Sequence, residues 1–207
     1  MKLSIHPLSS NSRRAAMVAH HLGLPVEMAI VDLAKGEQRS PAHLALHPGG
    51  KVPVLQDGDF VLTESWAIML YLVEKTPNPL YPAALHTRAH IHEWMFWAAS
   101  HWSTQVSILN FENMIKGMLG AGPADPARVA LAETEVRACA KRLDAHLATR
   151  AYLVGEALTL ADFAVATPLM STVPAKLPVT DSVHLQRWFA TITELPAWRA
   201  TEPTFSR

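Results

Sequence analysis

The sequence predicts a two-domain protein: an α/β domain with a four-stranded mixed sheet in the order βαβαββα, followed by an all-α helical bundle. Short apolar runs alternate with helical patterns over the first 76 residues. Three prolines then stand within the seven residues from Thr76 to Pro82, which is typical of a linker. Beyond this point the apolar spacing is helical throughout. We therefore expect a first domain over residues 1–76, a linker over 77–86 and a helical domain over 87–207.

Four elements are predicted before residue 47. Pro7 ends the first strand, and Gly23-Leu24-Pro25 ends the first helix. The connection through that helix is long enough for a parallel crossover between the first two strands. The four elements are a strand at 3–5, a helix at 15–22, a strand at 26–31 and a helix at 40–45.

Residues 52–65 predict a hairpin that leads directly into a helix. Asp57-Gly58 between two apolar runs is typical of a two-residue type I′ turn. Pro53 stands at a strand start, and a cis peptide bond before it would leave the backbone of Val52 unpaired. Thr63-Glu64-Ser65 then opens a helix, whose first N–H groups are free to bind an anion. An unpaired strand segment beside an anion-binding helix start suits a short acidic peptide.

Four helical stretches are predicted in the second domain, separated by glycines and prolines. Thr159 and Asp162, at the start of the third stretch, form a capping-box variant with aspartate in place of glutamate. Because this motif is a folding signal, we expect no catalytic role for Asp162. The four stretches are Thr87–Leu119, Pro126–Leu147, Leu160–Ser171 and Val183–Thr193.

The overall composition excludes several function classes. There are 18 Lys and Arg and 18 Asp and Glu, so the net charge is zero and no basic field exists for nucleic acid or a membrane surface. The single cysteine, Cys139, excludes an internal disulfide framework and a cysteine-based zinc cluster. No apolar run approaches about 18 residues. The N-terminus has no signal-peptide pattern, so we expect a cytoplasmic protein.

The eleven histidines raise the question of a metal site. His43 with His47, and His86 with His90, stand four residues apart, which would suit two ligands on one helix face. Neither pair has a third ligand nearby in the sequence, so we expect no bound metal.

Four local motifs occur in order along nearly the whole chain. They are His6-Pro7-Leu8-Ser9 with Ser12-Arg13-Arg14, Asp32-Leu33 with Gly36-Glu37-Gln38-Arg39, Gly50-Lys51-Val52-Pro53 with Glu64-Ser65, and the segment from Gly155 to Phe163. Together with the domain order, they resemble the cytosolic glutathione S-transferase family of the phi/theta-like serine type. The resemblance implies a thioredoxin-like first domain, glutathione as cosubstrate without a metal, and a homodimer.

The reaction that the resemblance implies is conjugation of the glutathione thiolate to small hydrophobic electrophiles. A thiol with a pKa of about 8.5 is mostly protonated at neutral pH, so the site must stabilise the thiolate. By pattern alone, Ser9, Ser10, Asn11 and Ser12 are helix-cap and turn residues. The resemblance assigns Ser9 as the hydrogen-bond donor to the sulfur, with Ser10 as the alternative, and leaves Asn11 or Ser12 as the cap.

The resemblance also implies a set of glutathione-binding residues. Val52, beside Pro53, would pair with the cysteine residue of glutathione as an added strand. Glu64 and Ser65 would hold the γ-glutamyl end at a helix start. By pattern alone, the charged members of the set are ordinary first-turn or solvated residues. The members that would face the glycine carboxylate are Gln38, Arg39 and Lys51.

The resemblance places the electrophile pocket along the fourth helix. Four-residue steps share one helix face, so His101, Gln105 and Leu109, together with Leu8, are the candidates. Two alternatives stay open: a glutathione-dependent isomerase or peroxidase, and a non-enzymatic binding protein with the same fold. Asn11 counts against the zeta-class isomerases, which have cysteine at that position.

Overall fold

The structure, a computed structural model, describes residues 1–203, and the chain divides into two compact units. The first comprises Met1–Tyr81 together with the chain from Glu194 on, and the second comprises Pro82–Thr193. The predicted boundary lies close to this division. The prediction of one helical domain over 87–207 differs from it, because the C-terminal segment belongs to the first unit; its last residues, 204–207, lie outside the described residues.

The sheet of the first unit confirms the predicted four-stranded mixed sheet. Its strands are β1 (Lys2–Ile5), β2 (Glu27–Ile30), β3 (Val54–Asp57) and β4 (Phe60–Thr63), in the order β2-β1-β3-β4. β1 pairs parallel with β2 and antiparallel with β3, and β3 pairs antiparallel with β4. The C-terminal end of β1, the N-terminal end of β3 and the C-terminal end of β4 therefore meet at one end of the sheet.

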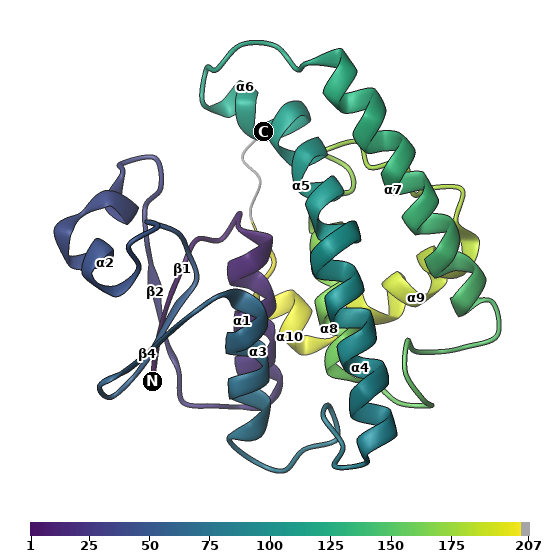
Figure 1. Cartoon of the computed structure of the whole chain (residues 1–207), viewed down its shortest axis with the longest axis horizontal. Helices are drawn as coiled ribbons and strands as arrows, with labels where there is room; N and C mark the ends of the chain where they lie inside the picture. Colours follow the sequence, from purple (N-terminus) through teal and green to yellow (C-terminus); the bar gives the residue numbers. More distant parts are fainter. Residues whose placement is uncertain (204–207) are drawn as a thin grey trace. The chain divides into compact units, whose positions relative to one another are not determined.

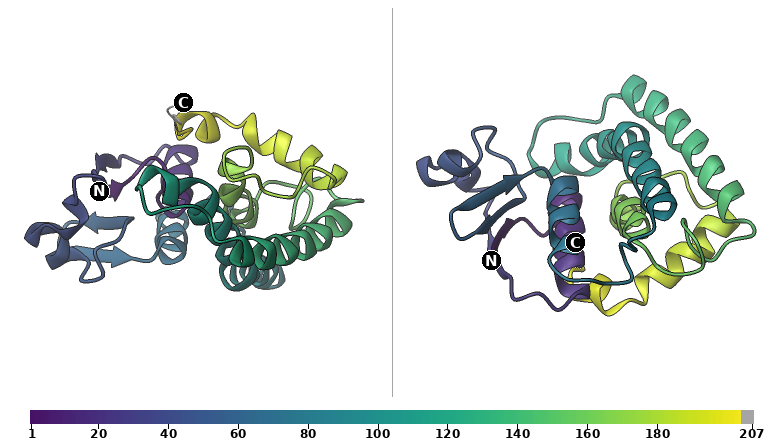
Figure 2. Two further views of the ribbon diagram at one scale, coloured as in Figure 1. Left: turned by 90° about the horizontal axis from the view of Figure 1, so that it is seen from above. Right: turned by 60° about the horizontal axis from the view of Figure 1, so that its bottom comes forward.

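Helices cover this sheet, and the first and third lie side by side along it (Figures 1 and 2). The helical elements of the unit are α1 (Ser10–His21), η1 (Glu37–Arg39), α2 (Pro41–Leu46), α3 (Ser65–Glu74) and α10 (Pro196–Ala200). Between the sheet, α1 and α3, each buried large apolar side chain contributes about 1.5–3 kcal/mol. The fully buried members of this core include Leu3, Met17, Val18, Leu55, Ile68, Met69 and Leu72.

The hairpin turn lies one residue later than predicted. Asp57 pairs with Phe60, so the two turn residues are Gly58 and Asp59 rather than Asp57 and Gly58. Gly58 has φ +60°, as the first central residue of a type II′ turn requires, whereas a type I′ turn needs positive φ at both central residues. The prediction of a type I′ turn at Asp57-Gly58 was therefore wrong, although the hairpin itself is confirmed.

The C-terminal helix α10 joins the first unit through Arg13 of α1. The Arg13 guanidinium lies 3.8 Å from the ring centroid of Trp198. It also donates to the carbonyl of Trp198 at 2.9 Å and to the Thr201 hydroxyl at 3.2 Å. These contacts, between residues almost 190 positions apart, could not be inferred from local sequence patterns.

The second unit, Pro82–Thr193, consists of helices and connecting loops without a strand, as predicted. The predicted stretch 87–119 is a run of helix that contains two π-helical segments, which are not visible in the apolar spacing. The elements are α4 (Leu85–Trp97), η2 (Ala98–Trp102), α5 (Ser103–Asn110), η3 (Phe111–Ile115), α6 (Lys116–Met118), α7 (Pro126–Leu147), α8 (Leu160–Ala166), η4 (Thr167–Ser171) and α9 (Val183–Thr193).

The start of α8 confirms the capping box. Asp162 is fully buried, and one carboxylate oxygen accepts from the Thr159 N–H at 2.8 Å. The other oxygen accepts from the Leu153 N–H at 3.0 Å and from the Trp188 indole N–H at 2.9 Å. Burial raises the pKa of Asp162, while these hydrogen bonds act in the opposite direction. The carboxylate is thus a structural centre that joins three segments of the unit.

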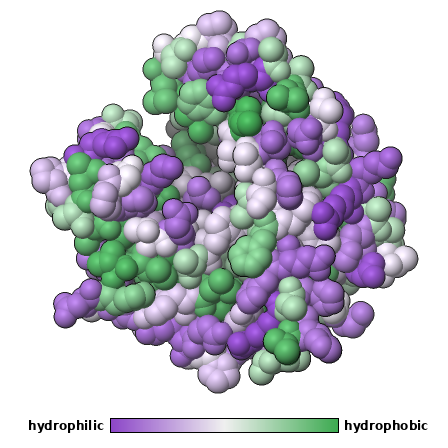
Figure 3. Space-filling model, in the orientation of Figure 1, coloured by the Kyte–Doolittle hydropathy of each residue, from purple (hydrophilic) through white to green (hydrophobic). Residues whose placement is uncertain are grey.

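Apolar side chains gather on the surface of the first unit over β4 (Figure 3). Phe60 and Val61 of this strand are 47% and 37% exposed. Over the second unit, apolar and polar residues are interspersed on the face shown. No helix within residues 1–203 combines the length and the apolar character needed to cross a membrane.

Candidate functional site

The predicted binding segments of the first unit converge at one end of the sheet. β1 leads into the turn before α1, Val52 and Pro53 precede β3, and β4 leads into Glu64 and Ser65. Both α1 and α3 begin at this end, and they pack against each other. The free N–H groups and the positive dipole ends of two helices therefore lie at the same end. This arrangement favours a ligand with negatively charged groups.

Ser9 is the N-cap of α1. Its hydroxyl oxygen accepts from the Ser12 N–H at 3.2 Å, and its backbone has the extended conformation of a cap. The prediction that Asn11 or Ser12 caps this helix was wrong, because the helix begins at Ser10. A hydroxyl that accepts a hydrogen bond still has its own proton to donate. Capping and donation to a ligand are therefore compatible at Ser9.

The turn before Ser9 is held by hydrogen bonds at both ends. The buried Ser12 hydroxyl accepts from the His6 N–H at 3.1 Å, and the Ser9 N–H donates to the His6 carbonyl at 3.0 Å. The His6 Nδ1 accepts from the Leu8 N–H at 3.3 Å, so the imidazole carries its proton on Nε2. Burial lowers the pKa of His6 and so favours this neutral form, while the negative charge of Asp32 acts in the opposite direction. The position of Ser9 is thus fixed by its neighbours.

Ser65, the first residue of α3, contacts the first turn of α1 through a buried arginine. Arg14 donates through Nη1 to the Ser65 hydroxyl at 3.2 Å and to the side-chain Oδ1 of Asn11 at 3.0 Å. The Ser65 hydroxyl donates to the same Asn11 Oδ1 at 3.4 Å. Arg14 is fully buried against the ring of Trp66, at 3.8 Å from its centroid, and burial lowers the pKa of Arg14 to about 9. The helix starts that carry Ser9 and Ser65 are therefore directly joined.

The backbone around Val52 and Glu64 departs from ordinary strand geometry. The peptide bond between Val52 and Pro53 is cis, as the sequence suggested. Neither the amide nor the carbonyl of Val52 hydrogen-bonds to another residue in the described part of the chain. Glu64 has φ +67°, a conformation that costs a non-glycine residue about 1–3 kcal/mol and that clusters at functional sites. Its side chain is exposed.

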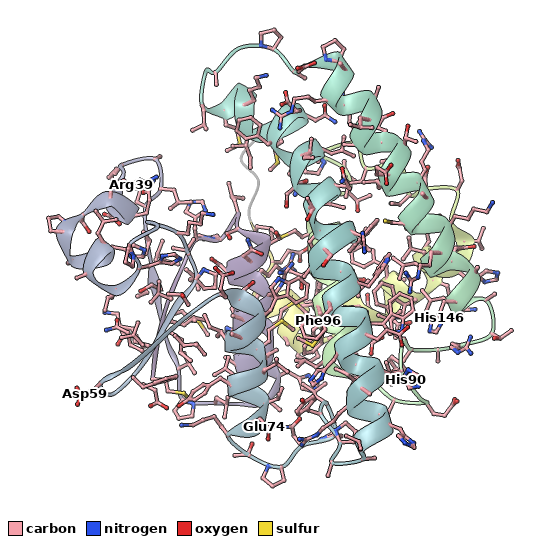
Figure 4. All side chains as sticks on the ribbon, viewed as in Figure 1. Arg39, Asp59, Glu74, His90, Phe96 and His146 are labelled. Atoms are coloured by element: carbon pink, nitrogen blue, oxygen red, sulfur yellow. The ribbon has the colours of Figure 1, made fainter. Side chains whose placement is uncertain are left out.

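The loop around η1 packs against the segment before Val52. A Cβ atom on Gly50 would lie 2.9 Å from the Gln38 carbonyl oxygen and 3.0 Å from the Arg39 guanidinium, so only glycine allows this approach. Gln38, Arg39 and Lys51 are thereby brought together. Arg39 is exposed and lies beside α2, at the other end of the unit from Asp59 in the hairpin turn (Figure 4). One amide N–H of Gln38 is used internally, on the Leu33 carbonyl at 3.4 Å.

The predicted pocket residues lie in different units. Leu8 belongs to the turn before α1 in the first unit. His101, Gln105 and Leu109 follow one another along η2 and α5 in the second unit, where His101 is exposed and Leu109 is fully buried. Their joint role in a pocket stays a prediction.

Two contributors to the site were not identified as such from the sequence. From the sequence, Arg14 stands out only as part of the Ser12-Arg13-Arg14 motif, and His43 only as a possible metal ligand. Both are buried on the inner sides of their helices. The signal that could have found them is a charged or polar side chain at a position with core spacing.

The structure gives the paired histidines other partners. His43 Nε2 lies 2.9 Å from the Lys51 carbonyl oxygen, and His90 pairs with Glu93 at 3.0 Å. Among residues 1–203, no three His, Cys, Asp or Glu side chains are grouped as metal ligands would be.

Comparisons with known proteins identify the family of the chain. Two family models match the chain: the N-terminal domain of glutathione S-transferases over residues 8–75 and the C-terminal domain over residues 112–196. Glutathione S-transferase 3 of Zea mays is 36% identical over 210 residues, which cover 97% of this chain and 92% of the relative.

Two solved structures extend the match to the fold. Glutathione S-transferase-I bound with lactoylglutathione is 28% identical, with a TM-score of 0.87 and 97% of each chain covered. Human glutathione transferase theta-2, in complex with glutathione and an unknown ligand, is 31% identical, with a TM-score of 0.84 and coverage of 92% of this chain and 80% of that one. The chain therefore belongs to the cytosolic glutathione S-transferase family and is phi/theta-like within it.

Proposed function

We propose that this glutathione S-transferase conjugates glutathione to small hydrophobic electrophiles and that the Ser9 hydroxyl stabilises the reacting thiolate. One observation carries the proposal: the starts of α1 and α3 and the unpaired backbone of Val52 meet at one end of the sheet. Glutathione matches this arrangement, because it has a peptide backbone in the middle, a carboxylate at each end and a thiol.

Backbone pairing supports the proposed position of the tripeptide. The free N–H and C=O of Val52 suit the cysteine residue of glutathione, added as a short antiparallel strand. The γ-glutamyl carboxylate then reaches the start of α3, where Ser65 offers its N–H and its hydroxyl. The Ser65 hydroxyl accepts from Arg14 and donates to Asn11 Oδ1 at a long 3.4 Å, and in this proposal its proton turns from Asn11 to the ligand carboxylate. Glu64, beside it, suits the γ-glutamyl ammonium group.

The glycine end of glutathione suits the loop beside Gly50. Arg39 and Lys51 are exposed cations there, and their charges complement a carboxylate. Gln38 contributes less in this proposal, since part of its amide is bound to Leu33.

The reaction needs one ionisation and one substitution. The thiol of glutathione loses its proton to solvent, and the Ser9 hydroxyl and the positive end of α1 stabilise the thiolate. The sulfur then attacks the electrophilic carbon, a carbon–sulfur bond forms, and the leaving group departs with the bonding electron pair. Ser9 donates a hydrogen bond throughout and forms no covalent bond.

The remaining parts of the proposal rest on family membership. Leu8, His101, Gln105 and Leu109 are proposed as pocket residues for the electrophile, and a homodimer as the assembled form. Analytical sedimentation tests the dimer, and a monomer at assay concentration would contradict it.

Titration calorimetry with glutathione, combined with a conjugation assay on a chlorodinitrobenzene, tests the proposed function. We expect binding and conjugation by the wild-type protein. Ser65→Ala should raise the KM for glutathione about tenfold, which corresponds to a loss of about 1.4 kcal/mol in binding free energy, with kcat little changed. Absence of glutathione binding would refute the proposal. Binding without conjugation would favour an isomerase, a peroxidase or a carrier.

A further inference from the structure

His43 lies behind the segment that is proposed to bind the middle of glutathione. Its side chain is only 7% exposed, and its Nε2 lies 2.9 Å from the carbonyl oxygen of Lys51. A carbonyl oxygen can only accept, so Nε2 carries a proton and donates it. His43 therefore makes a buried hydrogen bond to the peptide that joins Lys51 to Val52.

The helix that carries His43 is itself fixed. The Ser40 hydroxyl caps α2 by accepting from the His43 N–H at 3.3 Å, and Pro41 occupies the first helical position. The His43 carbonyl accepts from the His47 N–H at 2.9 Å at the other end of this short helix. The imidazole is thus held by a capped helix rather than by a free loop.

The hydrogen bond determines which way the Val52 amide faces. A trans peptide unit is planar, and its C=O and N–H point in opposite directions. With the Lys51 carbonyl directed to His43, the Val52 N–H is directed away from α2. That N–H is the group without a partner in the described chain. It is also the one that strand addition by a ligand would use.

We propose that His43 is a positioning residue for glutathione binding, which fixes the Lys51–Val52 peptide plane so that the Val52 N–H faces the ligand. The inference rests on the proposed function, since it assumes that glutathione pairs with Val52. His43 does not touch the ligand and takes no part in the chemistry. Its effect is to remove the rotational freedom that this peptide would otherwise lose on binding.

The test compares His43→Phe, which keeps an aromatic ring of similar volume without the donor, with His43→Gln, whose amide nitrogen can reach the position of Nε2. His20→Phe, at an exposed position of the same unit, is the matched control. The measurements are the Kd for glutathione by calorimetry, kcat and KM in conjugation, the melting temperature, and the amide nitrogen chemical shift of Val52 in protein labelled on valine.

We expect His43→Phe to raise the Kd and the KM for glutathione about 5- to 10-fold, with kcat at saturating glutathione within about 2-fold. The Val52 signal should move, since its amide nitrogen senses the hydrogen bond at the preceding carbonyl. His43→Gln should recover the wild-type Kd within about 2-fold and return the Val52 signal. His20→Phe should resemble the wild type. If His43→Phe does not fold, His43→Asn, whose amide is too short to reach Lys51, takes its place.

Three outcomes would overturn the inference. His43→Phe could bind glutathione as the wild type does with an unchanged Val52 signal. Both variants could lose affinity equally while folded, which would indicate a role in packing alone. The wild-type protein could fail to bind glutathione, in which case the proposed function fails as well, whereas in the first two outcomes it stands.

Discussion

The starts of α1 and α8 use similar capping residues for different purposes. Ser9 at α1 is partly exposed and uses its oxygen to cap the helix, which leaves its proton available. Thr159 and Asp162 at α8 are buried, and both carboxylate oxygens of Asp162 are occupied by donors from three segments. Spare hydrogen-bonding capacity at an accessible surface marks a group that can act on a ligand. A buried group whose hydrogen-bonding capacity is fully used, such as the Asp162 carboxylate, instead stabilises the fold.

The largest effect is expected at the buried helix start. Asp162→Ala would leave the N–H groups of Leu153, Thr159 and Trp188 buried without acceptors, and we expect a loss of about 3–5 kcal/mol in unfolding free energy. Urea unfolding measures it. Thr159→Ala, which removes the hydroxyl and one methyl group but keeps the carboxylate, is the control and should cost about 1 kcal/mol. Equal, small losses in both variants would show that the carboxylate is not the structural centre described above.

The next effect is expected at Ser9, on activity rather than on stability. Ser9→Gly removes the hydroxyl but keeps most of the capping tendency, so we expect kcat/KM to fall about 100-fold with only a few tenths of a kcal/mol lost in stability. Ser9→Ala should lose the same activity and about 1 kcal/mol of stability. Steady-state kinetics and thermal melting separate the two roles. Full activity in both variants would refute the assignment of Ser9.

A smaller effect is expected at Gly50, which allows the η1 loop to approach the segment before Val52. Gly50→Ala would combine a positive φ with a Cβ only 2.9 Å from the Gln38 carbonyl oxygen, so we expect about 1–2 kcal/mol of destabilisation and a raised KM for glutathione. Gly36→Ala is the control, because its φ is also positive but no atom lies within 4 Å of the new Cβ. Identical effects in the two variants would show that the close approach does not matter.

The smallest effect is expected at Asp57, at the far end of the first unit from the site. Hydrogen bonds from Lys75 and Tyr71 lower the pKa of Asp57, so this carboxylate stabilises the fold above its unfolded pKa of about 4. That contribution to stability is lost as the pH falls through the lowered pKa of Asp57 in the folded state. Asp57→Asn should therefore melt slightly below the wild type at pH 7, and the two should converge under acidic conditions. Glutathione affinity should not change; a change would show that this end is coupled to the site.

Local patterns were enough to predict most of the architecture. The strands, the capping box and the helix that follows the hairpin are all specified by residues within a few positions of one another. The segments that meet at the candidate site could also be named from the sequence, because each is a strand end or a helix start; their role in binding stays a prediction. The hairpin turn was misplaced by one residue, because both candidate pairs include Gly58 and only the strand register distinguishes them.

Contacts between distant residues could not be predicted in this way. Arg13 binds α10, and Arg14 joins two helix starts, but neighbouring arginines in a helix look alike in sequence. The π-helical segments η2 and η3 interrupt a continuous helical pattern and have no signature in the apolar spacing. The electrophile is the least predictable part, since apolar residues that line a pocket have the same spacing as those of a core.

If the Ser9 hydroxyl stabilises the glutathione thiolate, as proposed, the pKa of the thiol in the bound complex must depend on Ser9. Ultraviolet absorbance of the thiolate, followed during a pH titration, gives this value for the wild type and for Ser9→Gly. We expect the wild-type complex to titrate at least about one unit below the free thiol value of about 8.5, a difference of about 1.4 kcal/mol, and the Ser9→Gly complex to return most of the way to the free value. An equally lowered pKa in the Ser9→Gly complex would contradict the proposed role of Ser9.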